Sequence, residues 1–364
     1  MKVRRLFRTF EEYGWETPSW EIAAKYGLDV GAVVRLDTNA SPHRPDRALN
    51  ALKKALDGMD VNQYPDTSYL ALREGLARYT GKDVGRFVVT NGADEGLDIT
   101  AKVFLDPGDE VIVPTPTYSM YRIISSIMGA SVVYVPRKKD FSLDTEAMLA
   151  AVTKRTKAIF LCNPNNPTAN ATPIREIEQL ARRTELAISV DEAYFEYCGE
   201  TALDLTDRLE NVIVCRTLSK AFSMAGVRVG YLVAREDTVK TLNMVRPPNS
   251  LSIPSLFLGE YALAHLSEMR SAVRAIVRER ELLTRRLASI KGIEPYPSET
   301  NFILFKVVGR NPDKVHERMM RKGLVLRNLS HVRGIENCLR TSVSTPQINA
   351  RLVDELETTM SQAA

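Results

Sequence analysis

The chain has 364 residues, 44% hydrophobic and 26% charged, which is the composition of a globular protein of about two domains. Its 49 Lys and Arg against 45 Asp and Glu residues give a net charge of +4, too small and too dispersed to predict a nucleic-acid partner. Even the longest basic run, Arg137 to Lys139, is interpreted as a solvated turn.

Short β-branched runs alternate with helix-like stretches between residues 85 and 235. The runs are RFVVT, DEVIVP, ASVVYVP, KAIFLC, LAISV, NVIVC and VGYLVA. This alternation of strand-like and helix-like stretches predicts a mostly parallel sheet that is covered by helices on both faces.

The pattern changes after residue 246. Prolines at 247, 248 and 254 mark a break, and apolar residues at three- and four-residue spacing then predict one or two long helices up to residue 290. Further on, NFILFKVV, LVLRNLS and CLRTSVS are predicted strands, while NPDKVHERMMRKG and TPQINARLVDELETTM are predicted helices. No internal repeat is present.

The predicted fold class is therefore α/β, with two domains and an arm. A large domain at residues 41–265 would hold the mostly parallel sheet and its helices. A smaller α+β domain would be built from residues 266–364 and from the N-terminal arm at residues 1–40.

No signal for secretion, membrane insertion or metal binding is found. The N-terminal stretch lacks an apolar core, and no window reaches about 18 uninterrupted apolar residues. The four cysteines form no CxxC pair, and the four histidines are too far apart for a local metal motif. We expect a cytoplasmic protein with no metal, no membrane partner and no disulfide framework.

Polar segments follow five of the predicted strands. NGADEG follows FVVT, TPTYSMY follows VIVP, NPNNPT follows IFLC, DEAY follows AISV, and RTLSK follows VIVC. Ligands of open α/β sheets bind outside the carboxyl ends of the strands, so we expect the five segments to converge on one site.

Part of this predicted site is suited to an anion. The expected donors are backbone amides at the start of a helix, with hydroxyls and a guanidinium from a later segment. These donors are Ala93, Asp94, Glu95, Thr217, Ser219 and Arg228. For the helix start alone, plain N-capping by Asp94 or Asn91 stays open as an alternative. Together the donors predict a phosphate cup.

The remaining candidates are an amine, a carboxylate and aromatic or amide side chains. Asp191 ends an apolar run, where a buried carboxylate needs a cation or a strong donor. Lys220 is placed to bond to an aldehyde, Tyr118 to stack on a ring, and Asn166 and Tyr194 to bind a phenolic oxygen. Each has an ordinary structural explanation, but their combination predicts pyridoxal 5′-phosphate (PLP) as the cofactor.

In this combination the sequence resembles the PLP-dependent aminotransferases of fold type I, and within them the histidinol-phosphate aminotransferases. The similar segments, in order, are NGADEG, PTYSMY, NPNNPT, DEAY, RTLSKAFSMAGVRVGY, SETNFIL and CLRTSV. The similarity extends from Tyr13 to about Thr345.

The resemblance implies roles around the cofactor. Lys220 would bond to the cofactor aldehyde and, once freed, move the Cα proton, while Asp191 would face the pyridine nitrogen. The implied partners of the ring and its oxygen are Tyr118, Asn166 and Tyr194, and those of the phosphate are Ala93, Asp94, Thr217, Ser219 and Arg228.

The resemblance also implies active sites that are shared between two subunits, and it implies contacts to the substrate. In the family a tyrosine of a YP pair reaches the cofactor phosphate of the other subunit, and Tyr64 matches it, which implies a homodimer. Arg340 matches the residue that binds the substrate α-carboxylate. Arg327 and Tyr13 match residues that face the substrate phosphate or the distal carboxylate of glutamate, and Asn39 matches a residue of a substrate loop.

The activity implied is amino transfer between L-histidinol phosphate and 2-oxoglutarate, which gives L-glutamate and belongs to histidine biosynthesis. An aromatic or general amino-acid aminotransferase, an amino-acid-phosphate decarboxylase on the same scaffold and a PLP-sensing regulator domain stay open as alternatives. The chain departs from the family pattern at NASPHRP (39–45), at PTA (167–169), at RTSVST and at PPNSLS, where Asn249 replaces an aromatic residue. These departures concern loops of the substrate pocket and leave the cofactor residues unchanged.

Overall fold

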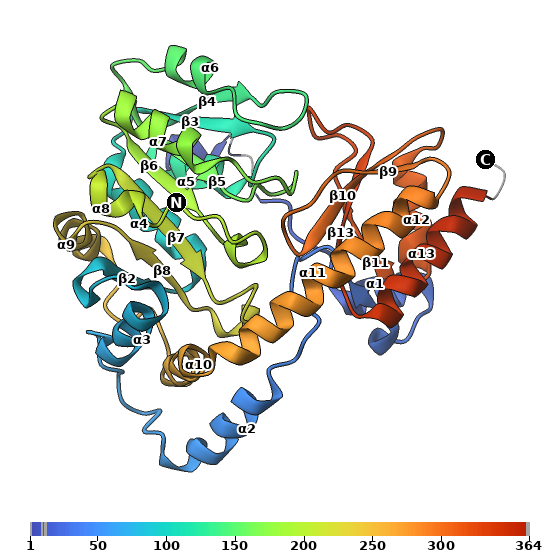
Figure 1. Cartoon of the computed structure of the whole chain (residues 1–364), viewed down its shortest axis with the longest axis horizontal. Helices are drawn as coiled ribbons and strands as arrows, with labels where there is room; N and C mark the ends of the chain where they lie inside the picture. Colours follow the sequence, from blue (N-terminus) through green and yellow to red (C-terminus); the bar gives the residue numbers. More distant parts are fainter. Residues whose placement is uncertain (1, 9, 11–12, 362–364) are drawn as a thin grey trace.

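Figure 1 shows the computed structural model of the chain, which describes residues 2–8, 10 and 13–361. Residues 1, 9, 11 and 12 of the predicted arm and residues 362–364 of the predicted small domain lie outside the described residues. The described chain forms a large lobe and a small lobe, and the long helix α11 (Leu266–Ser289) runs from one to the other.

The large lobe is built on a seven-stranded sheet of order β2-β8-β7-β6-β5-β3-β4. Its strands are β2 (Phe87–Thr90), β3 (Glu110–Thr115), β4 (Ser131–Pro136), β5 (Thr156–Cys162), β6 (Ala187–Asp191), β7 (Val212–Thr217) and β8 (Gly230–Val233). Neighbouring strands are parallel except at β8, which pairs antiparallel with β2 and with β7. The predicted mostly parallel sheet is confirmed.

Helices cover both faces of this sheet. One face carries α4 (Gly92–Phe104), α5 (Met120–Met128) and α9 (Glu236–Val245). The other side holds α3 (Leu70–Thr80), α6 (Thr145–Ala150), α7 (Ile174–Arg183), α8 (Leu205–Arg208) and α10 (Ile253–Ala264), with α2 (Asp46–Ala55) packed on α10. Alternation along each strand explains the two layers: in β5, Phe160 packs into the first layer and Ile159 and Leu161 into the second.

The small lobe is an α+β unit. Its antiparallel sheet of order β12-β13-β10-β9 consists of β9 (Ile293–Pro295), β10 (Phe302–Val307), β12 (Arg327–Asn328) and β13 (Cys338–Ser342). Besides α11, its helices are α12 (Pro312–Arg321) and α13 (Pro346–Ser361). The N-terminal part adds α1 (Ser19–Tyr26), which contacts α12, and β1 (Val34–Arg35), which pairs with β11 (Leu324–Val325). The N-terminal part thus packs on the small α+β unit.

Two local predictions differ from the structure. The stretch LVLRNLS forms two short strands, because the chain changes partner at Leu326, from β1 to β13. The solvated turn predicted at Arg137 is wrong for that residue, which is only 8% exposed. Its guanidinium donates to the carbonyl of Phe141 at 3.0 Å and so ties the two ends of the turn together.

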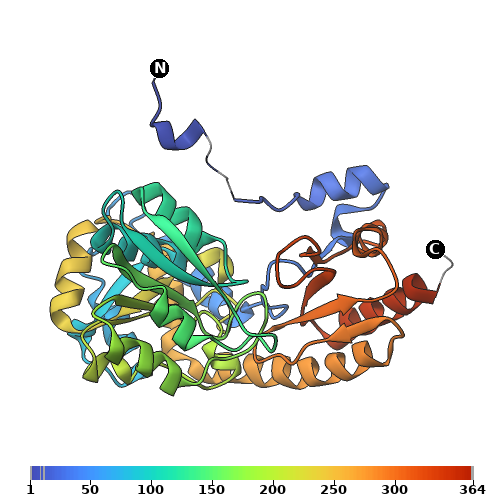
Figure 2. The same ribbon diagram turned by 90° about the horizontal axis from the view of Figure 1, so that it is seen from above.

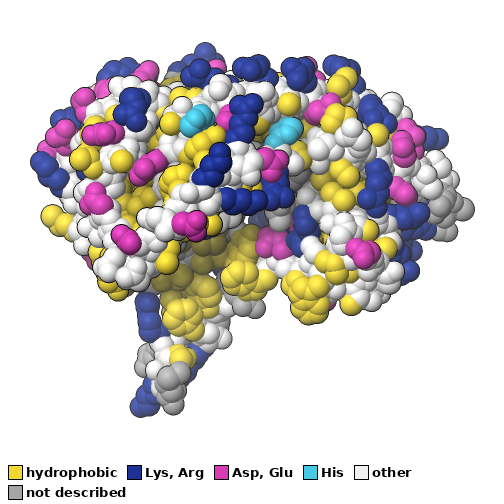
Figure 3. Space-filling model, turned by 90° about the horizontal axis from the view of Figure 1, so that it is seen from below, with side chains coloured by type: hydrophobic (Ala, Val, Ile, Leu, Met, Phe, Trp, Pro, Cys, Tyr) yellow, Lys and Arg dark blue, Asp and Glu magenta, His cyan; other side chains and the backbone are white. Residues whose placement is uncertain are grey.

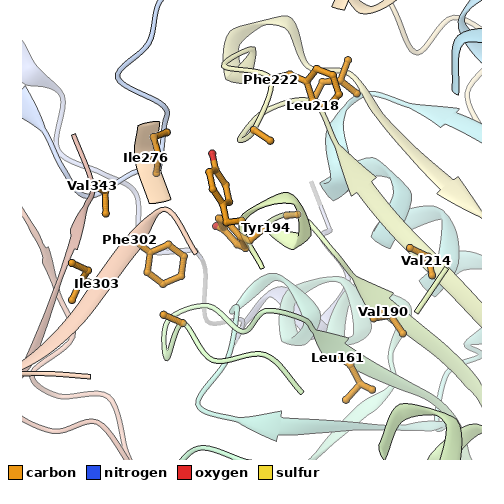
Figure 4. Packing of buried hydrophobic residues seen from close by; sticks show 14 of the residues in the cluster. Leu161, Val190, Tyr194, Val214, Leu218, Phe222, Ile276, Phe302, Ile303 and Val343 are labelled. Atoms are coloured by element: carbon orange, nitrogen blue, oxygen red, sulfur yellow. The ribbon is translucent and has the colours of Figure 1, made fainter. Parts of the chain in front are cut away.

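One hydrophobic cluster joins the two lobes. Figure 4 shows Leu161, Val190 and Val214 of the large sheet in the same cluster as Phe302 of the small sheet, with Tyr194 between them. The ring of Tyr194 lies edge-on to that of Phe302, with centroids 5.2 Å apart. This packing holds the carboxyl ends of the large sheet against the strands of the small lobe.

The surface shows no segregation of charge on the side in view. Figure 3 shows Lys and Arg side chains interspersed with Asp and Glu over that face. Within the described ranges, no helix is long and apolar enough to cross a membrane. In the same ranges, His, Cys, Asp and Glu form no group of three or more that could hold a metal ion.

Candidate active site

A cavity of about 470 Å³ lies between the lobes, at the carboxyl ends of the large sheet. The segments that follow β2, β3, β5, β6 and β7 all reach it, so the five predicted segments do meet. The predicted site residues that line it are Tyr13, Asn39, Ala93, Asp94, Tyr118, Asn166, Asp191, Tyr194, Thr217, Ser219, Lys220, Arg228, Arg327 and Arg340.

Two predicted residues, Glu95 and Tyr64, lie outside this lining. The Glu95 carboxylate accepts a hydrogen bond from the amide of Asn91 at 2.6 Å and so caps the start of α4. Tyr64 lies between α2 and α3 and is 83% exposed. Tyr64 is therefore not part of the cavity of its own chain.

Lys220 enters the cavity from the turn after β7. Its ammonium donates to the carbonyl of Thr38 at 3.2 Å and lies 5.8 Å from the centre of the Tyr194 ring. Burial lowers the pKa of the Lys220 amine to about 8, and the nearby cation of Arg340 acts in the same direction. A sizeable fraction of this amine is therefore neutral, and nucleophilic, at moderately alkaline pH.

Asp191 faces the cavity from the end of β6 and is buried. Its Oδ2 accepts from the Tyr121 hydroxyl at 2.8 Å, and its Oδ1 accepts from the Ala193 amide at 3.1 Å. Burial raises the pKa of the Asp191 carboxyl to about 6, although both hydrogen bonds act against this. A buried carboxylate whose hydrogen-bond donors are both neutral is suited to a cationic ring nitrogen.

Tyr121 is a site residue that the sequence analysis missed. It is fully buried beneath Asp191, stacked on Phe160 with centroids 5.6 Å apart, and edge-on to Tyr118 at 5.8 Å. The available signal was its place beside Tyr118 in the segment TPTYSMY, which follows a predicted strand.

Glycines allow the start of α4 to approach Arg228 closely. Gly92 has a φ of 76°, and a Cβ there would lie 2.5 Å from the Arg228 guanidinium. A Cβ at Gly230 would lie 2.4 Å from the carbonyl carbon of Gly92. Only glycine fits at either position. The first amides of α4 and the guanidinium therefore share one end of the cavity.

The hydroxyls expected at this end are also in place. The Thr217 hydroxyl donates to Ser219 Oγ at 2.8 Å, and Arg228 reaches the same oxygen at 3.5 Å. Arg228 also lies 3.4 Å from Asp94, whose carboxylate accepts from the Tyr118 hydroxyl at 3.1 Å. These groups form a cradle of donors that can hold a phosphate.

Two arginines form the opposite wall. Arg327 and Arg340 are direct partners on antiparallel strands, so their side chains leave the sheet on the same side. Arg340 donates to Asn166 Oδ1 and to the Asp37 carbonyl, both at 2.5 Å, while its Nε has no hydrogen-bond partner among the described residues. Burial lowers the pKa of Arg340 to about 10. A buried guanidinium with a donor to spare is suited to bind an anion.

The N-terminal stretch meets this wall at Arg327. Arg327 donates to Glu16 Oε1 at 3.4 Å, and the same oxygen accepts from the Tyr13 hydroxyl at 3.2 Å. Burial raises the pKa of Tyr13, and the charge of Glu16 adds to the effect. Glu16 lines the cavity, yet no motif of the sequence marked it.

Asn39 connects the arm to both lobes. Its amide side chain donates to the Tyr194 hydroxyl at 3.1 Å, and its backbone amide donates to Ser342 Oγ at 3.0 Å. Burial raises the pKa of Tyr194 well above its ordinary value, so its hydroxyl stays protonated and can donate into the cavity.

Comparison with known proteins gives the family. The chain matches the model of "Aminotransferase class I and II" over residues 31–356. It belongs to this family. A histidinol-phosphate aminotransferase of Caldanaerobacter subterraneus is 38% identical over 329 residues, which cover 90% of this chain and 93% of that protein. The resemblance seen in the sequence is thereby confirmed.

Solved structures share the fold of this aminotransferase. Histidinol-phosphate aminotransferase from Sinorhizobium meliloti, in complex with PLP, matches with a TM-score of 0.88 and 24% identity, covering 99% of this chain and 97% of that one. L-threonine-O-3-phosphate decarboxylase from Porphyromonas gingivalis matches with a TM-score of 0.80 and 21% identity, covering 91% and 100%. Because one fold serves both reactions, the fold does not choose between them.

Proposed function

We propose that this aminotransferase uses PLP to transfer the amino group between L-histidinol phosphate and 2-oxoglutarate, in histidine biosynthesis. One observation carries the proposal. The Lys220 amine and the buried Asp191 carboxylate face a cavity whose opposite wall presents Arg327 and Arg340. The 38% identical relative bears the corresponding name and supports this choice of substrate.

The residues present fit PLP. Asp191 would hold the ring nitrogen, because it is a buried carboxylate with only neutral hydrogen-bond donors. Tyr118 would lie against the ring, and Asn166 and Tyr194 would bind its oxygen. The phosphate would be held by the amides of Ala93 and Asp94 and by the side chains of Thr217, Ser219 and Arg228. When bound, PLP supplies a protonated ring that accepts the electrons left on Cα when its proton departs.

Lys220 would carry out the proton transfers. Its amine, with a pKa of about 8, can take the proton from Cα and return it on the other side of the transferred nitrogen. Arg340 would hold the α-carboxylate of glutamate, while Arg327 and Tyr13 would hold its distal carboxylate. Histidinol phosphate has no carboxylate, so Arg340 would then meet its phosphate or its alcohol.

A donor comparison tests this proposal. We expect the holoenzyme to form glutamate from 2-oxoglutarate with histidinol phosphate, and to do so more efficiently than with phenylalanine or leucine. Preference for phenylalanine or leucine would move the function to an aromatic or general aminotransferase. Release of carbon dioxide from an amino-acid phosphate, without any keto acid, would favour the decarboxylase.

We further propose that the active enzyme is a homodimer in which Tyr64 of one subunit binds the cofactor phosphate of the other. Its exposure supports this assignment. Mixing Lys220→Ala protein with Tyr64→Ala protein, after partial denaturation and renaturation, should restore activity, since the hybrid dimer would contain one intact site. Failure to restore it would contradict shared sites.

The domain division and the location complete the proposal. Residues 41–265 would form the cofactor-binding domain, and residues 266–364 with the arm at 1–40 would form the small domain. The cytoplasmic location stays a prediction.

A further inference from the structure

We propose that Glu16 is an internal competitor of the substrate, since its carboxylate binds the same two groups, Arg327 and Tyr13, that would hold the substrate's distal anion. This inference rests on the proposed function. It adds a residue that determines how strongly the enzyme favours anionic side chains over neutral ones.

The hydrogen bonds of Glu16 are the first argument. A single oxygen, Oε1, accepts from the Tyr13 hydroxyl at 3.2 Å and lies 3.4 Å from Arg327. A phenol has only one hydrogen to donate, so Tyr13 cannot serve Glu16 and a substrate oxygen at the same time. The guanidinium of Arg327 has further N–H groups, but its charge is partly compensated while Glu16 is near.

The backbone keeps Glu16 beside this site. The carbonyl of the next residue, Thr17, accepts from Arg35 at 2.6 Å, and Arg35 is itself hydrogen-bonded to the buried Asp37. Farther upstream, Arg4 donates to the carbonyl of Ile127 on the large lobe at 3.1 Å. Figure 2 shows the N-terminal stretch running from above the large lobe to α1 beside the small lobe.

The side chain of Glu16 can nevertheless give way. It is 30% exposed, and the side chain of Arg327 is 29% exposed, so the carboxylate can turn toward solvent without unfolding its surroundings. A substrate phosphate or carboxylate must displace it, because two anions in contact repel each other. A neutral side chain has no need of Arg327 and leaves Glu16 in place.

The competition therefore weakens binding of anionic partners and of the products derived from them, while neutral donors are unaffected. It would keep 2-oxoglutarate and glutamate from binding too tightly to leave the site. Charged groups near Glu16 include Arg35 as well as Arg327, and Arg340 lies farther along the same wall.

Glu16→Gln tests the proposal, because it removes the charge and keeps the shape. We expect the KM for glutamate and for histidinol phosphate to fall about three- to fivefold, the effect of a partly exposed ion pair, with kcat/KM for phenylalanine unchanged within about twofold. The matched control is Glu21→Gln, which removes the same charge from an exposed position in α1. It should leave all three substrates unchanged within about twofold.

Two results would overturn the proposal. An equal change for glutamate and phenylalanine would give Glu16 a structural role only. A higher KM for histidinol phosphate alone would mean that the carboxylate binds the substrate imidazole instead.

A double-mutant cycle with Arg327→Ala identifies the partner. In the Arg327→Ala background, Glu16→Gln should lower the KM for glutamate by much less, since only the contact of Glu16 with Tyr13 remains, and an undiminished effect would contradict the competition at Arg327. Inhibition by glutarate gives a second readout, since its inhibition constant should fall by the same factor in Glu16→Gln protein. If the enzyme does not turn over histidinol phosphate, the proposed donor is wrong, while glutamate and glutarate still decide the role of Glu16.

Discussion

The two walls of the cavity are built in different ways. The cofactor wall comes from the large sheet, and its residues are Ala93, Asp94, Asp191, Thr217, Ser219, Lys220 and Arg228. The substrate wall comes from the small lobe and the N-terminal stretch, and its residues are Tyr13, Glu16, Arg327 and Arg340. Exposure does not separate the walls. Asp191 and Thr217 are buried in the first, where the side chains of Arg228 and Asp94 are 44% and 46% exposed. In the second, Arg340 is buried, and Glu16 and Arg327 are half-buried.

The residues that carry out the chemistry and those that select the substrate therefore lie on different walls. Neighbouring strands of one sheet hold the cofactor wall, so its geometry is set by the core of the protein. The substrate wall depends on contacts between distant parts of the chain, with Arg327 and Glu16 311 residues apart. We therefore expect changes in the cofactor wall to abolish turnover with every donor, and changes in the substrate wall to act on some donors only.

Replacement of Lys220 should have the largest effect. Lys220→Ala removes both the nucleophile and the base, so kcat should fall by several orders of magnitude with glutamate and phenylalanine alike. Steady-state assays with both donors would measure this, and circular dichroism would check that the variant is folded. Turnover within about tenfold of the parent would remove Lys220 from the chemistry.

Asp191→Asn should have the next largest effect. The change keeps the shape of the side chain but removes the charge expected to face the ring nitrogen, so kcat should fall at least about a hundredfold. The loss should again be equal for glutamate and phenylalanine. An unchanged kcat would mean that another group stabilises the ring.

Arg327→Ala should weaken anionic donors and leave neutral donors nearly unaffected. Because Arg327 is half-buried, we expect a loss of about 1 to 3 kcal/mol, or roughly five- to 150-fold in KM, for glutamate and histidinol phosphate. Phenylalanine and leucine should be nearly unaffected. Equal losses for all four donors would place Arg327 in the scaffold.

The pH dependence of cofactor attachment tests the environment of Lys220. Burial lowers the amine pKa to about 8, and only the neutral amine reacts with the aldehyde. Between pH 7 and pH 9, the rate of attachment to the apoprotein should therefore rise only about tenfold. An amine of ordinary pKa would give about a hundredfold rise. Absorbance measures the rate, and a lysine peptide under the same conditions corrects for titration of the cofactor.

Ala169→Gly should have the smallest effect. Ala169 is buried with a φ of 64°, a conformation that favours glycine, so the change relieves strain of about 1 to 2 kcal/mol. Loss of a buried methyl and the greater freedom of glycine when unfolded oppose this gain by a similar amount. Thermal unfolding should show a change below about 1 kcal/mol, with kcat unchanged. A larger loss of stability would mean that packing outweighs strain at this position.

Sequence reasoning was more complete for the cofactor wall than for the substrate wall. Residues such as Asp191 and Lys220 follow strands in short motifs, and the strand-end rule places such motifs together. The sequence analysis missed Tyr121 because a buried tyrosine beside Tyr118 has the pattern of an ordinary core residue. Glu16 escaped because its role depends on Arg327, with which it shares no local pattern.

Elements of the fold follow the same division. The short apolar runs between helix-like stretches predicted the strands of the large sheet, since strands buried on both faces are nearly continuous apolar runs. The change of partner at Leu326 was hidden, because a strand pattern does not say which neighbour each residue pairs with. The burial of Arg137 was also hidden, since it depends on the carbonyl of Phe141 and on the fold around the turn.

The most direct test of the account is to follow the two half-reactions separately by absorbance of the holoenzyme. Histidinol phosphate alone should remove the absorbance band of the lysine-bound cofactor, and 2-oxoglutarate added afterwards should restore it with one glutamate formed per active site. Borohydride applied before the donor should fix the cofactor to Lys220 and abolish both changes. A band that histidinol phosphate leaves unchanged, while phenylalanine removes it, would contradict the proposed donor. A cofactor that borohydride fixes to a residue other than Lys220 would contradict the assignment of the site itself.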